Sequence, residues 1–253
     1  MSHTMILTGA SRGLGAAIAS IFLEASSAHN LVAVSRSAGS LDELKQRFGN
    51  RLQIVQGSVT SAEVSEQAIS VALAQFGAIN SVVANAGVLA PVAKVENADV
   101  GAWKNLFDIN FFSVVQLVQK AMPHLAKTRG NVVAVLSGAS VSNYQGWGAY
   151  GASKAALDHF IGTVAVENSA VRAISIAPGV VATDMQQQIR DVHSHAMLAE
   201  AVEKFKSLFE QNNLIPPEVP ARVYVNLAVH GWSEDVNGKY FRFDNACLRD
   251  YSK

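Results

Sequence analysis

A serine, two tyrosines and a lysine lie close together in the segment SGASVSNYQGWGAYGASK, which runs from Ser137 to Lys154. A tyrosine with an ordinary pKa near 10 exchanges its proton poorly at neutral pH, and a nearby ammonium lowers that pKa. Tyr150 and Lys154 lie about one helical turn apart and so share a face of the predicted helix. Tyr144 has no lysine at that spacing. Tyr150 is therefore the candidate proton donor, for example to the oxygen of a ketone that accepts a hydride.

Ser137 stands at the end of a predicted strand, where its hydroxyl could hydrogen-bond the same ketone oxygen. A nucleophilic serine would need a histidine base and an orienting acid, so we expect Ser137 to polarise the carbonyl rather than attack it. On spacing alone, a surface pair without function explains Tyr150 and Lys154 better than a catalytic pair does. The catalytic interpretation therefore depends on what the rest of the chain supplies.

A glycine-rich loop, TGASRGLG, covers residues 8–15 and joins a predicted strand to a predicted helix. Glycines there permit a tight turn, and backbone N–H groups at a helix N-terminus favour a pyrophosphate. This context in the first strand–helix unit of the chain predicts a dinucleotide site. The loop residues expected to line the cofactor are Gly9, Ser11, Arg12, Gly13, Leu14 and Gly15.

The end of the second predicted strand indicates which dinucleotide is bound. A carboxylate that would bind the ribose 2′-OH of NAD is absent there, and Ser35-Arg36 occupies the position. A guanidinium forks well onto a phosphate, and Arg12 in the glycine loop is expected to reach the same side. Either arginine alone could be an ordinary exposed charge, but together they favour a 2′-phosphate and hence NADP(H).

Short β-branched runs alternate with longer helical patterns along the chain. Several strands are apolar at successive positions, as in residues 132–136, which is typical of a sheet covered by helices on both faces. The alternation predicts one doubly wound α/β domain of Rossmann type over residues 1–253, with a seven-stranded parallel sheet. The expected strands are Met5–Thr8, Leu31–Ser35, Leu52–Gln56, Ser81–Ala84, Asn131–Ser137, Val171–Ala177 and Tyr240–Phe243. The expected helices are Leu14–Ser26, Leu41–Phe48, Ser61–Phe76, Asp99–Leu125, Tyr150–Asn168, Met185–Gln211 and Pro217–Val229.

One stretch interrupts this alternation, at about residues 184–215. It is amphipathic, and it follows the carboxyl end of a predicted strand, where open α/β sheets bind ligands. A substrate lid and a packing decoration explain it about equally well.

The composition excludes several classes of function. The 20 Lys and Arg residues balance the 20 Asp and Glu residues, so no basic field attracts nucleic acid or an anionic membrane. The seven histidines form no zinc-like set with other ligands, and the single Cys247 excludes an internal disulfide. A strand pattern begins at Thr4, and no apolar run has the length of a membrane span. We therefore expect a cytoplasmic protein without a targeting peptide or a metal.

The chain resembles the short-chain dehydrogenase/reductase family over essentially its whole length. The order and spacing of several separate elements carry this resemblance, from the glycine loop to the catalytic segment. The elements are the TGxxxGxG pattern at residues 8–15, Asn85-Ala86-Gly87, Asn110 within DINFF, Ser137, Tyr150-x-x-x-Lys154 and Pro178-Gly179 followed by Thr183.

The resemblance implies roles for these residues. Tyr150 would be the general acid and base, Ser137 would orient the substrate carbonyl, and Lys154 would lower the tyrosine pKa and hold the nicotinamide ribose. Asn110 would position a water molecule for proton relay. Further cofactor contacts are implied at Ser58, Val59, Asn85, Ala86, Gly87, Pro178, Gly179, Val181 and Thr183. Ser58 stands where the family often has an aspartate for the adenine amino group, which puts that contact in doubt.

Finer motifs are similar to the sepiapterin reductase and benzil reductase branch, which reduces bulky dicarbonyl compounds. They include GWxAY at residues 146–150 and GKYFRFD at residues 238–244. The candidate substrate residues are Leu89, Tyr144, Trp147, Met185 and Asp244. The main expectation is an NADPH-dependent carbonyl or diketone reductase that forms a homodimer or a higher homo-oligomer. An NADP-dependent alcohol dehydrogenase working oxidatively and a non-catalytic NADP(H)-binding regulator are the alternatives.

Overall fold

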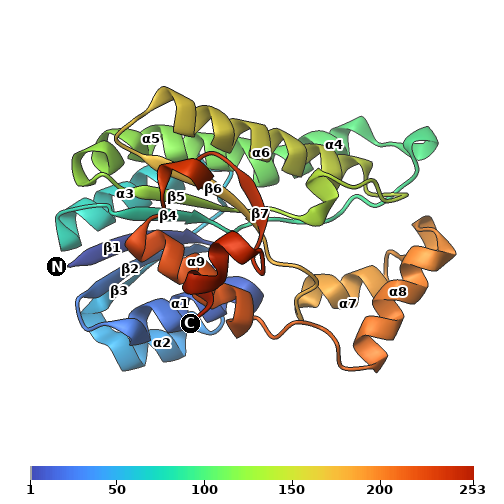
Figure 1. Cartoon of the computed structure of the whole chain (residues 1–253), viewed down its shortest axis with the longest axis horizontal. Coiled ribbons are helices and arrows are strands. Elements are labelled where there is room, and N and C mark those ends of the chain that lie inside the picture. The colour runs from blue at the N-terminus through green and yellow to red at the C-terminus, as the bar shows by residue number, and fades with distance from the viewer. Residues whose placement is uncertain (1) are drawn as a thin grey trace.

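A seven-stranded parallel sheet forms the centre of the structure, a computed structural model that describes residues 2–253 (Figure 1). The strands follow the order β3-β2-β1-β4-β5-β6-β7, and each neighbouring pair is parallel. This confirms the predicted doubly wound α/β sheet. The strands are β1 (His3–Thr8), β2 (His29–Ser35), β3 (Leu52–Gln56), β4 (Ser81–Ala84), β5 (Asn131–Val135), β6 (Arg172–Ala177) and β7 (Tyr240–Arg242).

Both faces of the sheet are buried, because helices cover each of them, and successive side chains of a strand point to opposite sides. In β1, Ile6 packs into one apolar core while Met5 and Leu7 pack into the other. Figure 1 shows the two helical layers that cover these faces. One layer contains α1 (Gly13–Ala25), α2 (Leu41–Phe48) and α9 (Glu218–His230), and the other contains α3 (Ala62–Phe76), α4 (Val100–Phe107), α5 (Ser113–Thr128) and α6 (Gly148–Glu167).

The predicted continuous helix over Asp99–Leu125 is wrong. The structure has α4 and α5 instead, joined by a π-helical turn at Asp108–Phe112. The helical pattern of apolar residues runs through this turn, so periodicity does not reveal it. Such turns insert one extra residue into the backbone ladder and are frequent at functional sites.

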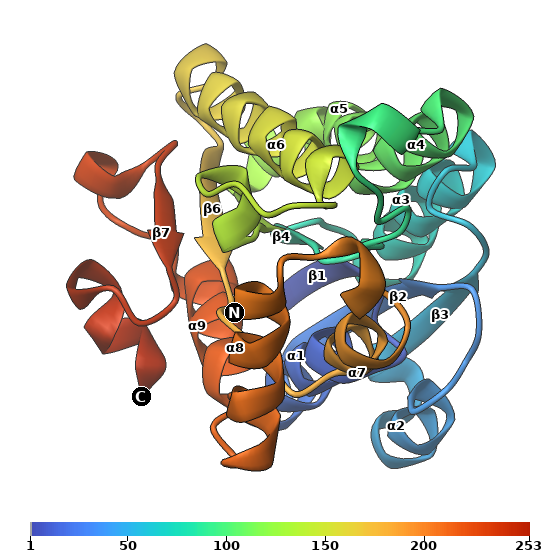
Figure 2. The same ribbon diagram turned by 90° about the vertical axis from the view of Figure 1, so that its right-hand side faces the viewer.

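The prediction of one helix over Met185–Gln211 is also wrong. This stretch forms α7 (Asp184–Asp191) and α8 (Ala199–Glu210), separated by a 3₁₀ turn at Ser194–Ala196. In Figure 2, α7 and α8 lie in front of the sheet, at the end where the strands finish. A single backbone bridge between Val181 and Ile215 ties the base of this segment together.

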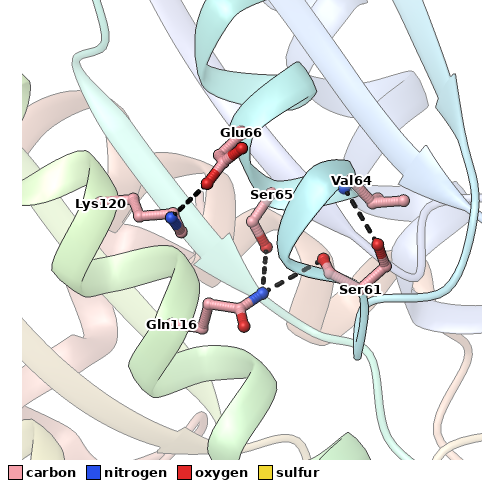
Figure 3. A network of polar contacts seen from close by, with 6 residues as sticks. All are labelled: Ser61, Val64, Ser65, Glu66, Gln116 and Lys120. Carbon is pink, nitrogen blue, oxygen red and sulfur yellow. Dashed lines mark hydrogen bonds and ion pairs between the residues drawn. The ribbon is translucent and has the colours of Figure 1, made fainter.

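A polar network pins α3 to α5, the helix that follows the π-helical turn (Figure 3). Gln116 on α5 donates hydrogen bonds to the backbone carbonyl of Ser61 and to the Ser65 hydroxyl, each 3.1 Å long. The Ser61 hydroxyl also caps α3 by accepting from the Val64 N–H, and Lys120 pairs with Glu66 at 2.6 Å. These contacts hold α5 against α3 in the layer that carries the π-helical turn.

Candidate cofactor and active site

The glycine loop between β1 and α1 has the backbone geometry that its sequence predicts. Gly9 and Gly13 adopt the positive φ angles of 66° and 53°, which L side chains rarely adopt. A Cβ on Gly15 would lie 2.0 Å from the Gly9 carbonyl oxygen, so only glycine fits there. Arg12 precedes the first turn of α1 without capping it through its side chain. The first N–H groups of α1 therefore have no side-chain cap, which suits an anionic ligand.

The end of β4 is fastened to this loop. The Thr8 hydroxyl accepts hydrogen bonds from the backbone N–H groups of Asn85 and Ala86, each 3.1 Å long. The Asn85 side chain donates to the carbonyls of Thr8 and Gly9, at 3.0 and 2.9 Å. Because β1 and β4 are neighbours where the order of strands reverses, this contact builds the crevice in which open α/β sheets bind ligands.

A cleft of about 780 Å³ opens at this crevice. Its volume lies in the range of ligand and cofactor sites, and its lining includes all of the residues predicted to contact a dinucleotide. These are Gly9, Ser11, Arg12, Gly13, Leu14, Gly15, Ser35, Arg36, Ser58, Val59, Asn85, Ala86, Gly87, Tyr150, Lys154, Pro178, Gly179, Val181 and Thr183. The glycine cradle, the uncapped helix terminus and the arginines fit a dinucleotide phosphate group.

The two arginines behave differently in the structure. Arg36 is exposed and has no ion-pair partner among residues 2–253. Arg12 is paired with Asp184, the first residue of α7, at a distance of 2.8 Å. The hydroxyl of Ser35 donates to the Ser37 carbonyl at 2.7 Å, and that of Ser58 is shared with Thr60 at 2.8 Å. Arg36 is thus the cation at the β2 end of the cleft that no carboxylate neutralises.

The candidate catalytic side chains come from the loop that follows β5 and from α6, and they meet at the cleft. Ser137, Tyr150 and Lys154 all line it, and both Tyr150 and Lys154 are buried. Lys154 donates a hydrogen bond to the Val135 carbonyl at 2.8 Å, and its ammonium lies 6.0 Å from the centre of the Tyr150 ring. Ser137 accepts a bond from the Ala139 N–H at 3.2 Å, which orients its hydroxyl.

Burial dominates the electrostatics of this pair. Because the charged forms lose hydration, burial raises the pKa of Tyr150 and lowers the pKa of Lys154 to about 8. A hydrogen bond from Ser137 to the phenol oxygen acts in the opposite direction and lowers the pKa of Tyr150. The expected lowering of this pKa by the Lys154 ammonium is not seen, because burial sets the direction of the shift and raises the pKa. Tyr150 is held as a protonated phenol, the form that can give a proton.

Asn110 lies in the π-helical turn and is fully buried. Its side-chain oxygen accepts from the Val88 N–H at 2.8 Å, while its nitrogen donates to the Val88 carbonyl at 2.9 Å and to Ser153 at 3.1 Å. This pairing fixes the loop after β4 against α6. Since its side chain is engaged, any water that Asn110 positions would have to bind its backbone within the distorted turn.

The candidate substrate residues separate into two groups. Leu89, Trp147 and Met185 line the cleft. Tyr144 does not, and instead packs against Trp147 with ring centres 4.9 Å apart. Asp244 also lies outside the lining and pairs with Arg242 at 3.2 Å.

Trp147 connects the catalytic segment to α8. Its ring meets Tyr150 edge to face at 5.8 Å and stacks on Phe205 of α8 at 5.7 Å. Sequence reasoning missed Phe205 and also the α7 residues Asp184, Gln186 and Ile189, which line the cleft. The amphipathic pattern of the 184–215 stretch was the only signal for them, and it does not say which face meets the cleft.

We also searched the described residues for membrane-spanning helices and for metal-binding clusters. Within residues 2–253, no helix combines the length and apolar character needed to cross a bilayer. The same residues contain no cluster of three or more His, Cys, Asp or Glu side chains placed to hold a metal ion. The parallel sheet, the glycine loop and the cleft at the strand-order reversal define a nucleotide-binding protein of Rossmann type.

Comparison with known proteins identifies the family. The model of the short chain dehydrogenase family matches residues 3–194, and the chain belongs to this family of oxidoreductases. It is 45% identical over 252 residues to an oxidoreductase of Saccharomyces cerevisiae, YIR035C, which is described as uncharacterised; the match covers 99% of each chain. The crystal structure of YIR035C matches all of both chains with a TM-score of 0.98 and 44% identity.

Two further similar proteins carry descriptions of their own reaction or cellular location. A benzil reductase of S. cerevisiae that forms (S)-benzoin is 37% identical, and the match covers 98% of each chain. A structure described as a cytoplasmic protein of unknown function from S. cerevisiae is 44% identical over all of both chains, with a TM-score of 0.85.

Proposed function

We propose that this oxidoreductase is an NADPH-dependent reductase of bulky ketones and diketones. The observation that carries the proposal is the meeting of Ser137, Tyr150 and Lys154 in the cleft that the glycine loop also lines. The relative that reduces benzil supports an aromatic diketone as the substrate class. Leu89 and Trp147 supply an apolar wall that suits such a compound.

In this proposal the chain orients the ketone and supplies the proton. When bound, NADPH supplies the hydride that adds to the carbonyl carbon, and the carbonyl oxygen takes a proton from the Tyr150 hydroxyl. Ser137 donates a hydrogen bond to that oxygen and so stabilises the charge that develops on it. The ammonium of Lys154 holds the nicotinamide ribose and offsets the charge left on Tyr150. The backbone around Asn110 holds the water that returns a proton to the site.

The cofactor preference rests on charge at the β2 end of the cleft. Arg36 offers a guanidinium to a 2′-phosphate without a neighbouring carboxylate that would bind a 2′-OH. The 184–215 segment is proposed as a substrate lid, because Asp184, Met185 and Ile189 line the cleft and Phe205 packs on Trp147. From here we call it the lid segment.

The proposal is tested with purified protein, NADPH and a panel of aromatic ketones and α-diketones. Loss of absorbance at the reduced-nicotinamide band, together with the expected hydroxyketone product, supports it. Binding of NADPH without oxidation across the whole panel would indicate a regulatory protein. Rapid oxidation of secondary alcohols with NADP⁺ at neutral pH, and no reduction of their ketones, would indicate an alcohol dehydrogenase.

We further propose a homo-oligomer in the cytoplasm. Phe112 and Val166, on the helical layer of α4, α5 and α6, are 54% and 88% exposed, and a second copy would cover such side chains. The exposed free Cys247 and the relative described as cytoplasmic support a reducing compartment. Sedimentation at several protein concentrations tests the oligomer, and a monomer at all of them contradicts it.

A further inference from the structure

The ion pair between Arg12 and Asp184 joins two walls of the cleft. Arg12 belongs to the glycine loop, Asp184 is the first residue of α7, and both line the cleft. The nitrogen and oxygen atoms are 2.8 Å apart, and the side chains are 64% and 62% exposed. The two segments also touch directly, since a Cβ on Gly13 would lie 3.1 Å from the Thr183 methyl carbon.

The same guanidinium is one of the two cations expected at the 2′-phosphate. An arginine has five N–H donors, so hydrogen-bond geometry alone would let it serve a carboxylate and a phosphate together. The negative charges of the carboxylate and the phosphate oppose such joint binding. A carboxylate held 2.8 Å from the Arg12 nitrogen neutralises the cation and repels an arriving phosphate dianion.

We propose that Asp184 competes with the 2′-phosphate of NADP(H) for Arg12 and thereby sets how strongly the protein prefers NADP(H) over NAD(H). This inference rests on the proposed cofactor preference. Asp184 is then a specificity-determining residue of the cofactor site, although it lies on the lid segment. Arg36, without an ion-pair partner among residues 2–253, holds the phosphate independently of Asp184.

The size of the effect follows from the exposure of the pair. An ion pair in contact with water is weak, so its loss changes the NADPH dissociation constant by about two- to fivefold. After releasing Arg12, the Asp184 carboxylate stays at the N-terminus of α7, where the helix dipole favours a negative charge. The free energy needed to move Arg12 from Asp184 to the phosphate is therefore small enough for the exchange to occur each time the cofactor binds.

Replacing Asp184→Asn removes the competing charge and keeps the size of the side chain. Dissociation constants for NADPH and NADH are measured by the fluorescence of the reduced nicotinamide, which requires no turnover. We expect NADPH to bind about two- to fivefold more tightly and NADH to change by less. Asp191→Asn removes the same charge from the far end of α7, outside the cleft lining. It controls for the general field of the helix and should leave the ratio of the two constants as in the wild type.

The double variant Arg12→Gln, Asp184→Asn tests whether the effect passes through Arg12. In the Arg12→Gln background, Asp184→Asn should no longer change the NADPH constant. The proposed competition would be overturned if Asp184→Asn bound NADPH and NADH more tightly by the same factor, or if it bound NADPH more weakly. It would also be overturned if Asp184→Asn gave the same gain in NADPH affinity in the Arg12→Gln background. A wild-type protein that binds NADH as well as NADPH would instead refute the proposed preference. A wild type that prefers NADPH, with an unchanged ratio in Asp184→Asn, refutes only the role of Asp184.

Discussion

Lys154 carries its ammonium 6.0 Å from the centre of the Tyr150 ring, and both side chains are buried on the same helix, α6. Burial moves their pKa values apart, because it raises that of Tyr150 and lowers that of Lys154 to about 8. At neutral pH the phenol therefore keeps its proton and the ammonium keeps its charge, and two such perturbed groups in one cleft are typical of a functional site.

The lysine predicts a pH dependence. Since the pKa of Lys154 is about 8, the ammonium loses its charge as the pH rises through that value, and kcat/KM for ketone reduction should fall. A pH profile with saturating NADPH measures this. The residual activity of Lys154→Met should lack this alkaline limb. If the kcat/KM of Lys154→Met falls at alkaline pH with the same midpoint as that of the wild type, another group causes the decrease.

Tyr150→Phe should remove the proton donor while leaving the cofactor cleft intact. General acid catalysis contributes about 10²- to 10⁴-fold, so we expect a loss of that size in kcat with NADPH binding nearly as in the wild type. Tyr144→Phe is the matched control, because that ring packs on Trp147 outside the cleft lining. Comparable losses in both variants would remove Tyr150 from its proposed role.

Arg36→Asp should reverse the charge at the 2′-phosphate position. We expect NADPH to bind roughly 10- to 100-fold more weakly and NADH to change little, because a carboxylate repels the phosphate and accepts a hydrogen bond from a 2′-OH. Arg47→Asp makes the same charge change at an exposed α2 residue outside the cleft lining. An equal loss of NADPH and NADH affinity in Arg36→Asp would contradict the assignment.

Phe205→Ala should loosen the lid segment. Phe205 is buried and stacks on Trp147, so its removal takes away the main aromatic contact between α8 and the catalytic segment. We expect KM for a bulky diketone to rise about tenfold, with NADPH binding close to wild type. Leu198→Ala, at the 55%-exposed residue that precedes α8, should have little effect. An unchanged KM in Phe205→Ala would indicate packing decoration rather than a lid.

His3 predicts a loss of stability in mild acid. Burial, together with the nearby His29 and His230, lowers the pKa of His3 from 6.5 to about 4. The unfolded chain therefore binds this proton first, and stability falls as the pH drops from about 6.5 to about 4. Between pH 7 and pH 5 the loss should be roughly 2 kcal/mol. The free energies of unfolding of the wild type and His3→Gln are measured with urea at both pH values. If the two proteins lose the same stability between pH 7 and pH 5, His3 is not the source of the loss.

Local sequence was sufficient for the sheet and for most of the cofactor cleft. Apolar runs such as Val132–Val135 are typical of strands in a covered parallel sheet. A glycine loop after the first such strand forms its turn from its own backbone preferences. The position of Tyr150 relative to Lys154 is likewise local, because one turn of α6 sets it. These features involve residues that are near neighbours in the chain or on the same helix.

The remaining features depend on packing between distant segments, which periodicity does not record. The π-helical turn at Asn110 lies within a continuous apolar pattern, and Asn110 is held there by Val88 on another loop. The place of Tyr144 outside the cleft depends on how α8 covers Trp147. Arg12 meets Asp184 only because the chain returns to the glycine loop after β6. Long-range packing thus determines which of the predicted polar residues are free to meet a ligand and which already have a partner.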